Sequence, residues 1–268
     1  MDALDEALQY RLAHYEIGHR LLYGTGTEKE TWLNWQGIRT LTKINLDEDF
    51  PEHQRILILA PHPDDEILGC AGLMQQLNAL GREMIVIAIT NGTASHPNST
   101  QFSPEQLNTI RPQESIAALH TLNLGHVSRI ELNLPDGQIS QNMHILVDQL
   151  KTLIQAQDIL ISTHEQDGHP DHELSAYAIK LVAQHFHLKH FQVFIWTWHW
   201  AKPNQADIDW TKAKRLDLSQ AQIDLKERAI RCFKTQTQVD VSTGNPPILP
   251  EYAIQRILMP YEVYINEN

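Results

Sequence analysis

Short apolar runs alternate with longer amphipathic segments along most of this 268-residue chain. The apolar runs predict buried strands, and the segments between them have the spacing of amphipathic helices. The predicted strands cover residues 55–60, 83–90, 127–132, 158–162 and 191–197, and the predicted helices lie near 66–80, 103–122, 140–155 and 172–186. This alternation with short connections indicates a mostly parallel sheet with helices on both faces. We expect a single Rossmann-like α/β domain.

The beginning of the chain departs from this alternation. A helical stripe predicts a helix over residues 4–23 that packs on the domain or on a partner subunit. The members of the stripe are Leu4, Leu8, Leu12, Tyr15 and Leu22. Residues 27–45 are irregular and rich in tryptophan, and we expect them to wrap around the core. The predicted organisation is therefore a helical extension over residues 1–50 and a main domain over residues 51–268.

The alternation weakens again after Trp196. Ser219 is a predicted N-cap for a helix that runs to about Lys234, and several prolines interrupt the segment that follows. The last stretch, YAIQRILMPYEVYI, predicts a helix or strand and then a final strand.

Two motifs of histidine and aspartate directly follow two of the predicted strands. They are HPDD at residues 62–65 and HPDH at residues 169–172. Residues three apart share a face of a first helical turn, and proline is accepted at the first helical position. The carboxyl ends of parallel strands are the usual place for a ligand site, and two imidazoles with one carboxylate are typical of a catalytic zinc. The motifs thus predict one metal site; the alternative is two acidic helix caps with incidental histidines.

These motifs resemble those of the PIG-L/LmbE-like family of zinc-dependent N-deacetylases. The resemblance runs from about Arg55 to Tyr264 and is most specific at APHPDDEILGCAGL and DGHPDHE. It implies that Asp64 is the general base and that His169 assists the transition state. The zinc ligands that it implies are His62, Asp65 and His172. It also implies that the C-terminal segment forms a cap over the site.

Further candidate residues lie outside the implied zinc ligands. Asp171 could assist catalysis by orienting an imidazole, or it is a simple acid in a first helical turn. The resemblance suggests that Arg111 reaches a polar or anionic substrate group; otherwise it is a surface arginine. Asp136 follows the third strand and could bind a sugar hydroxyl, or it only forms a turn. In the run Trp196–Trp200, a tryptophan face and His199 could line the pocket, unless the run is a packed core strand.

Composition narrows the classes of function. The formal net charge of −12 opposes binding to phosphate backbones, so we expect no nucleic-acid partner. The acidic start of the chain predicts no signal peptide, and the absence of a run of about 18 apolar residues predicts no membrane span. Two cysteines, Cys70 and Cys232, are too few for a disulfide framework and favour a cytoplasmic protein. A homo-oligomer stays open.

These observations favour a zinc-dependent hydrolase. We expect it to remove an N-acetyl, or another N-acyl, group from an amino sugar or sugar conjugate by attack of metal-bound water. One Zn²⁺ per chain is expected, although another divalent metal would suit the same donors. One alternative is a deacylase for a non-sugar N-acyl substrate. The other is a non-catalytic module that binds a sugar or nucleotide, which the absence of a glycine-rich phosphate loop makes weaker.

Overall fold

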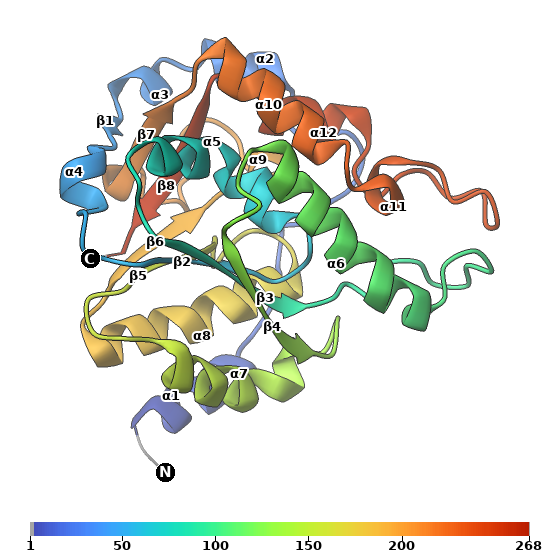
Figure 1. Cartoon of the computed structure of the whole chain (residues 1–268), viewed down its shortest axis with the longest axis horizontal. Coiled ribbons are helices and arrows are strands. Elements are labelled where there is room, and N and C mark those ends of the chain that lie inside the picture. Colours follow the sequence, from blue (N-terminus) through green and yellow to red (C-terminus); the bar gives the residue numbers. More distant parts are fainter. Residues whose placement is uncertain (1–2, 268) are drawn as a thin grey trace.

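An eight-stranded sheet forms the centre of the computed structural model, which describes residues 3–267 (Figure 1). The strand order is β1-β7-β8-β6-β5-β2-β3-β4, and β8 runs antiparallel to both of its neighbours while the other pairs are parallel. The strands are β1 Thr42–Lys43, β2 Ile56–Ala60, β3 Met84–Thr90, β4 Ser128–Leu134, β5 Ile159–Thr163, β6 Lys189–Val193, β7 Ala213–Asp217 and β8 Tyr261–Asn266. The predicted α/β fold with a mostly parallel sheet is confirmed.

Helices cover both faces of the sheet, as Figure 1 shows. The covering helices are α1 Ala3–Ala13, α7 Ile139–Leu153 and α8 Pro170–Phe186 on one face, and α5 Asp65–Ala79, α6 Pro104–Thr121 and α10 Gln220–Ile230 on the other. Strand β2 explains this layering, because Ile56 and Ile58 join the core beneath α5 and α6 whereas Leu57 and Leu59 join the core beneath α7 and α8. A strand that is buried on both faces has a continuous apolar sequence.

The first 50 residues contribute more than one helix. Helix α1 ends at Ala13, so the predicted helix over residues 4–23 is too long, and residues 14–28 form no regular element. The short elements α2 Lys29–Asn34, α3 Gln36–Thr40 and α4 Leu46–Asp49 follow, and β1 pairs with β7 at the edge of the sheet. Residues 1, 2 and 268 of the predicted domains lie outside the described residues, and the boundary at residue 50 stays a prediction.

The segment after β6 corrects a second prediction. Residues 194–197 do not continue the strand, and α9 covers Thr197–Trp200. The strand ends here because of a contact with a distant part of the chain. The buried Asp167 carboxylate accepts hydrogen bonds from the backbone N–H groups of Ile195, Trp196 and Thr197 at 2.8–3.1 Å. These bonds turn the chain away from the sheet.

The C-terminal part returns to the sheet after passing over α5 and α6. Ser219 caps α10 as predicted, but α10 ends at Ile230; α11 Lys234–Thr237 and α12 Glu251–Ile257 follow. From β8, the buried Glu262 accepts hydrogen bonds from the Gly72 and Leu73 N–H groups of α5 and from the Lys226 ammonium, at 2.7–2.9 Å. The last strand therefore holds the first helix of the main domain. Among residues 3–267, no helix is long and apolar enough to cross a membrane.

Candidate metal centre

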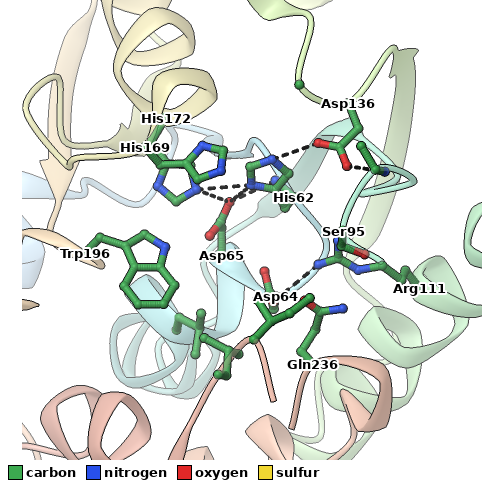
Figure 2. Close-up of a pocket in the computed structure, with 15 residues that line it drawn as sticks. His62, Asp64, Asp65, Ser95, Arg111, Asp136, His169, His172, Trp196 and Gln236 are labelled. Atoms are coloured by element: carbon green, nitrogen blue, oxygen red, sulfur yellow. Dashed lines mark hydrogen bonds and ion pairs between the residues drawn. The ribbon is translucent and has the colours of Figure 1, made fainter. Parts of the chain in front are cut away.

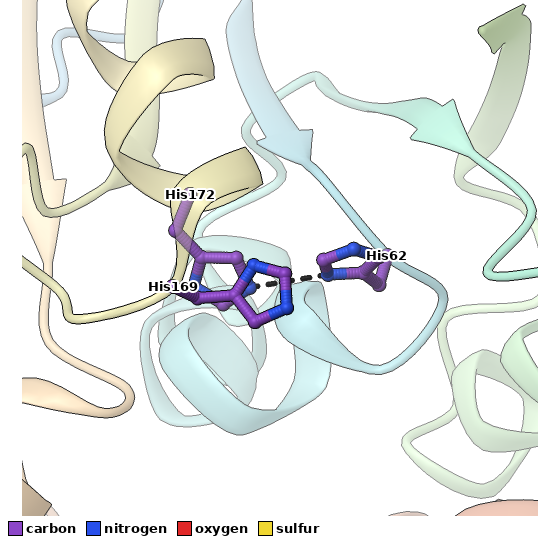
Figure 3. Close-up of side chains that lie close together, drawn as sticks. All are labelled: His62, His169 and His172. Carbon is purple, nitrogen blue, oxygen red and sulfur yellow. Dashed lines mark hydrogen bonds between the residues drawn. The ribbon is translucent and has the colours of Figure 1, made fainter. Parts of the chain in front are cut away.

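The two motifs meet at the carboxyl ends of β2 and β5, which are neighbours in the sheet. Figures 2 and 3 show the ring of His62 facing those of His169 and His172. His62 Nδ1 lies 3.1 Å from His172 Nε2, and Asp65 Oδ2 lies 3.4 Å and 3.2 Å from these two nitrogens. The structure thus brings the three predicted zinc ligands together.

The separations of these donor atoms fit a small tetrahedral metal ion. Ligand atoms about 2.0–2.1 Å from a tetrahedral zinc lie about 3.3 Å from one another. The observed 3.1–3.4 Å triangle matches this value, and all three side chains are buried. The ring nitrogens of His62, His169 and His172 also lie within 4.8 Å of one another, but His169 Nδ1 accepts a hydrogen bond from the Asp171 N–H. The set with Asp65 therefore fits best.

Carboxylates contact both imidazoles of the proposed metal site. His172 Nδ1 lies 2.8 Å from Asp167 Oδ2, and His62 Nε2 lies 3.1 Å from Asp136 Oδ1. Each contact places a hydrogen on the nitrogen that faces the carboxylate and leaves the other nitrogen free as a metal ligand. Asp171 lies 3.5 Å from His62 Nε2 and accepts hydrogen bonds from the Gly137 and Ile139 N–H groups. This placement supports the predicted orienting role of Asp171, which stays a prediction.

Asp167 is one of the residues that the sequence analysis missed. Its carboxylate is fully buried and accepts from His172 Nδ1, from three backbone N–H groups and from the Thr197 hydroxyl. An Asp-Gly pair before a histidine motif looks like an ordinary turn. Its position five residues before His172 was the available signal, but spacing alone does not show which carboxylate reaches an imidazole.

Asp64 lies between the strand and helix α5 in an uncommon backbone conformation. Its φ is 137°, in a region that residues with a side chain rarely adopt. The Asp64 N–H donates to Glu66 Oε2 at 3.1 Å, and Ser115 Oγ donates to the other oxygen of Glu66. Arg111 Nη2 lies 3.3 Å from Asp64 Oδ2 and donates to the Pro63 carbonyl. Neighbouring side chains therefore hold this turn, so that Asp64 and Asp65 have different contacts.

Burial and charge act oppositely on the two aspartates. Burial raises the pKa of Asp64 to about 8, against the attraction of Arg111. Burial also opposes ionisation of Asp65, but the charge and hydrogen bond of His172 hold the pKa of Asp65 well below its usual value. The ionised carboxylate of Asp65 suits a metal ligand, and the perturbed pKa of Asp64 suits a group that exchanges a proton.

The histidines of the two motifs also differ. Burial would lower the pKa of His62 and of His172, but the surrounding carboxylates outweigh it and raise the pKa of His172 to about 9. Burial and the neighbouring imidazoles lower the pKa of His169 to about 3. His169 is thus neutral, whereas a metal ion at the other two imidazoles would take the place of protons.

The donors open onto a cavity of about 360 Å³ (Figure 2). Its polar wall includes Asp64, Ser95, Arg111, Asp136, His169 and Gln236, and its apolar wall consists of Leu68, Trp196, Ile248 and Leu249. Gln236 lies in α11, and Ile248 and Leu249 precede α12, so the C-terminal segment covers part of the site.

One predicted substrate residue lies elsewhere. His199 does not line this cavity, because its ring lies 2.9 Å from the Tyr23 carbonyl oxygen and 2.7 Å from Arg256 Nη2. Helix α9 explains the difference: Trp196 precedes it and faces the cavity, whereas His199 points from it toward the N-terminal segment. The predicted strand-like alternation of this run was wrong. The substrate contacts predicted for Arg111 and Asp136 stay predictions, although both residues line the cavity.

Comparison with known families agrees with this geometry. The family model of PIG-L, described as GlcNAc-PI de-N-acetylase, matches residues 57–183. Over these residues, which make up just under half of the chain, the sequence is similar to the PIG-L family. The match contains both motifs, β2 to β5 and most of α8, so the family segment carries all three proposed metal ligands. A search of curated proteins gave no match.

Several solved structures share the fold. The N,N'-diacetylchitobiose deacetylase from Pyrococcus horikoshii is 20% identical, with a TM-score of 0.55 over 77% of this chain and 78% of that one. The deacetylase of the A40926 pseudoaglycone is 21% identical, with a TM-score of 0.58 over 80% and 96% of the two chains. GalB, the 4-carboxy-2-hydroxymuconate hydratase of Pseudomonas putida, is 14% identical, with a TM-score of 0.55 over 80% and 96%. This fold therefore occurs both in proteins described as deacetylases and in one described as a hydratase.

Proposed function

We propose that this protein is a zinc-dependent N-deacetylase that releases acetate from an N-acetylated amino sugar or sugar conjugate. The observation that carries the proposal is that the two adjacent aspartates of the first motif occupy different positions in the site. Asp65 completes a triangle of metal donors, while the adjacent Asp64 lines the same cavity outside that triangle. Hydrolysis by a metal-activated water needs both a metal site and a proton acceptor beside it.

The protein's own groups suit amide hydrolysis. When bound, zinc would lower the pKa of a water molecule and polarise the substrate carbonyl. Asp64 is placed to take the proton of the attacking water and to return it to the leaving amine, and Arg111 holds its carboxylate. Because His169 Nδ1 accepts from the Asp171 N–H, its Nε2 carries the hydrogen and can donate to the developing oxyanion.

The lining of the cavity supports a sugar substrate. Its polar wall offers amide, hydroxyl and guanidinium groups, and Trp196 offers an aromatic face opposite them (Figure 2). Two structural neighbours are described as deacetylases of N,N'-diacetylchitobiose and of a pseudoaglycone, which supports the same class of substrate here. The proposed location is the cytoplasm, since Cys70 and Cys232 are both free thiols.

A screen of zinc-loaded protein against N-acetylated sugars tests the proposal. Acetate and free amine should appear in equal amounts, and the Asp64→Asn variant, loaded with zinc to the same level, should release neither at a comparable rate. N-acetylated amino acids and peptides in the same screen test the non-sugar alternative. A wild-type protein that binds zinc and yet hydrolyses no N-acyl compound would contradict the proposal, and the hydratase neighbour GalB then makes addition of water to a carbon–carbon double bond the next reaction to assay.

A further inference from the structure

A buried carboxylate directly follows the metal ligand His172. Glu173 is fully buried in the first turn of α8, and hydrogen bonds engage both of its oxygens. Arg20 donates from Nε to Oε1 at 2.7 Å and from Nη2 to Oε2 at 2.8 Å, and the Gly168 N–H donates to Oε1 at 2.9 Å. Glu173 thus connects the N-terminal segment to the loop in front of the HPDH motif.

The position of the Gly168 amide makes this connection important for the site. Gly168 lies between Asp167, which orients His172, and His169, which lines the cavity. Its φ is +88°, and a Cβ at this position would lie 2.8 Å from the Arg20 carbonyl oxygen. The backbone of the N-terminal segment therefore packs directly on the loop, and only glycine fits beneath it.

The same segment is also attached to α9. The Thr27 N–H donates to the His199 carbonyl at 2.8 Å, and the Thr27 hydroxyl donates to the Ala201 carbonyl at 2.6 Å. The Tyr23 carbonyl lies 2.9 Å from His199 Nε2. Because α9 directly follows Trp196, these bonds tie the segment to the apolar wall of the cavity.

We infer that Arg20 is a positioning residue for the second motif: through Glu173 and the Gly168 amide, it holds the loop that carries Asp167 and His169. The expected effect of Arg20 on turnover rests on the proposed function. Its expected effect on metal binding does not, because metal binding is measured without a substrate. Arg20 lies outside the segment matched by the PIG-L family model, so this part of the site comes from the N-terminal extension.

The charges of the pair explain why arginine suits this position. A carboxylate that is fully buried is stable as an anion only with a matched cation and hydrogen bonds. The Arg20 side chain is 14% exposed and presents two parallel N–H donors, which fix the direction of the carboxylate as well as its charge. A lysine would supply the charge but not the two-pronged geometry.

The test compares Arg20→Ala, Arg20→Lys and wild-type protein, with Arg231→Ala as a matched control. Arg231 makes a similar contact with both oxygens of Glu251, at 3.1 Å and 2.8 Å, but this pair is exposed and far from the motifs in the chain. Three quantities are measured on full-length protein: the rate of zinc release to a chelator, kcat and KM on the best acetylated substrate, and the thermal midpoint.

Arg20→Ala should release zinc about 10-fold faster and lose about 10-fold in kcat, the lower end of the effect of removing groups that support metal ligands. KM should change little, Arg20→Lys should recover part of both losses, and Arg231→Ala should match wild type. A folded Arg20→Ala protein with a lower thermal midpoint but normal zinc release and kcat would overturn the inference.

A further variant covers the case in which Arg20→Ala does not fold. In Arg20→Ala/Glu173→Gln the buried charge is absent, and the comparison is with Glu173→Gln alone. Faster zinc release from the double variant supports the inference, and equal release rates overturn it. If the wild-type protein hydrolyses no substrate, the proposed function fails while the zinc-release comparison still decides the role of Arg20.

Discussion

The HPDD and HPDH motifs have nearly the same sequence, but they enter their helices at different residues. Helix α5 begins at Asp65, so His62 and Pro63 lie before it, whereas α8 begins at Pro170 with His169 as its N-cap. The prediction that proline takes the first helical position is therefore confirmed for Pro170 and wrong for Pro63. The predicted shared helical face likewise applies to the second motif alone.

The backbone explains the difference. His169 is extended, with φ of −113°, and caps its own helix through the Asp171 N–H, whereas Asp64 has φ of 137° and depends on Glu66 and Arg111. The first motif uses an uncommon turn to give two adjacent carboxylates different surroundings. The second uses an ordinary helix start to present two imidazoles. The two motifs have similar sequences but different geometry. Helix α5 begins three residues after His62, whereas α8 begins one residue after His169.

The largest expected effect separates the two aspartates of the first motif. Asp64→Asn should keep zinc and lose about 10² to 10⁴ in rate, because an amide cannot accept the proton of the attacking water. Asp65→Asn should lose zinc, since a neutral amide oxygen is a weaker ligand than a carboxylate. Zinc content and acetate release, measured on both folded variants, test the division. Near wild-type turnover by zinc-loaded Asp64→Asn would make His169 the leading candidate for the base.

The next effect compares the carboxylates that orient the two imidazoles. Asp167→Asn should reduce zinc affinity or activity by about 10- to 100-fold, as is typical for such partners of metal ligands. Asp136→Asn should cost less, because Asp136 lies at the cavity wall and a second carboxylate, Asp171, lies near the same nitrogen of His62. Competition with a chelator measures both affinities. The opposite order would show that the first motif depends more on its orienting group.

A smaller effect concerns the support of the Asp64 turn. Ser115→Ala should reduce the free energy of unfolding by about 1–3 kcal/mol, because it leaves an oxygen of the buried Glu66 without its donor. Thr163→Val, at the end of β5, is the control for the second motif, because its hydroxyl donates to the His172 carbonyl at 3.1 Å and the loss should be about 1 kcal/mol. Urea titration measures both, and equal losses would argue against special support for the first turn.

The last expected effect is seen only as a slope of stability with pH, and it contrasts the buried His190 with the exposed His144. Burial lowers the pKa of His190 to about 3, so the folded protein keeps it neutral while the unfolded chain binds a proton below about 6.5. Stability should therefore fall by up to about 1.4 kcal/mol per pH unit as the pH drops from 6.5 toward 3 on account of this group. His190→Gln should flatten this slope between pH 6 and 4.5, and the exposed His144→Gln should not. Equal slopes in both variants would exclude His190 as the source.

The strands at the centre of the sheet could be predicted because each is buried on both faces and is therefore a continuous run of apolar residues. Residues 55–60, 83–90 and 158–162 were expected, and β2, β3 and β5 lie within one residue of those bounds. The antiparallel insertion of β8 could not be predicted, because the order of strands depends on contacts between residues that are distant in the chain. The turn after Val193 depends likewise on the distant carboxylate of Asp167.

The candidate site shows the same division. The cluster of proposed metal ligands could be predicted because the residue types, their spacing and their position after strands all indicated the same chemistry, and the structure brings their donor atoms within 3.4 Å of one another. Their role as metal ligands stays a prediction. The side chains that contact and support these proposed ligands could not be predicted from the sequence. Asp167, Glu173 and Arg20 act through buried contacts that no local pattern reports, and His199 was assigned to the cavity because a helical turn was interpreted as a strand.

The place of β8 has a consequence for how the protein is made. It is the last strand of the sheet in chain order, yet it lies between β6 and β7 and brings Glu262 to Lys226 and to the backbone of α5. As the ribosome releases the chain, both motifs emerge long before residues 261–266, while β6 still has an open edge and Lys226 lacks its counter-charge. We expect the nascent protein to remain incompletely assembled, and dependent on protection from aggregation, until translation has passed β8.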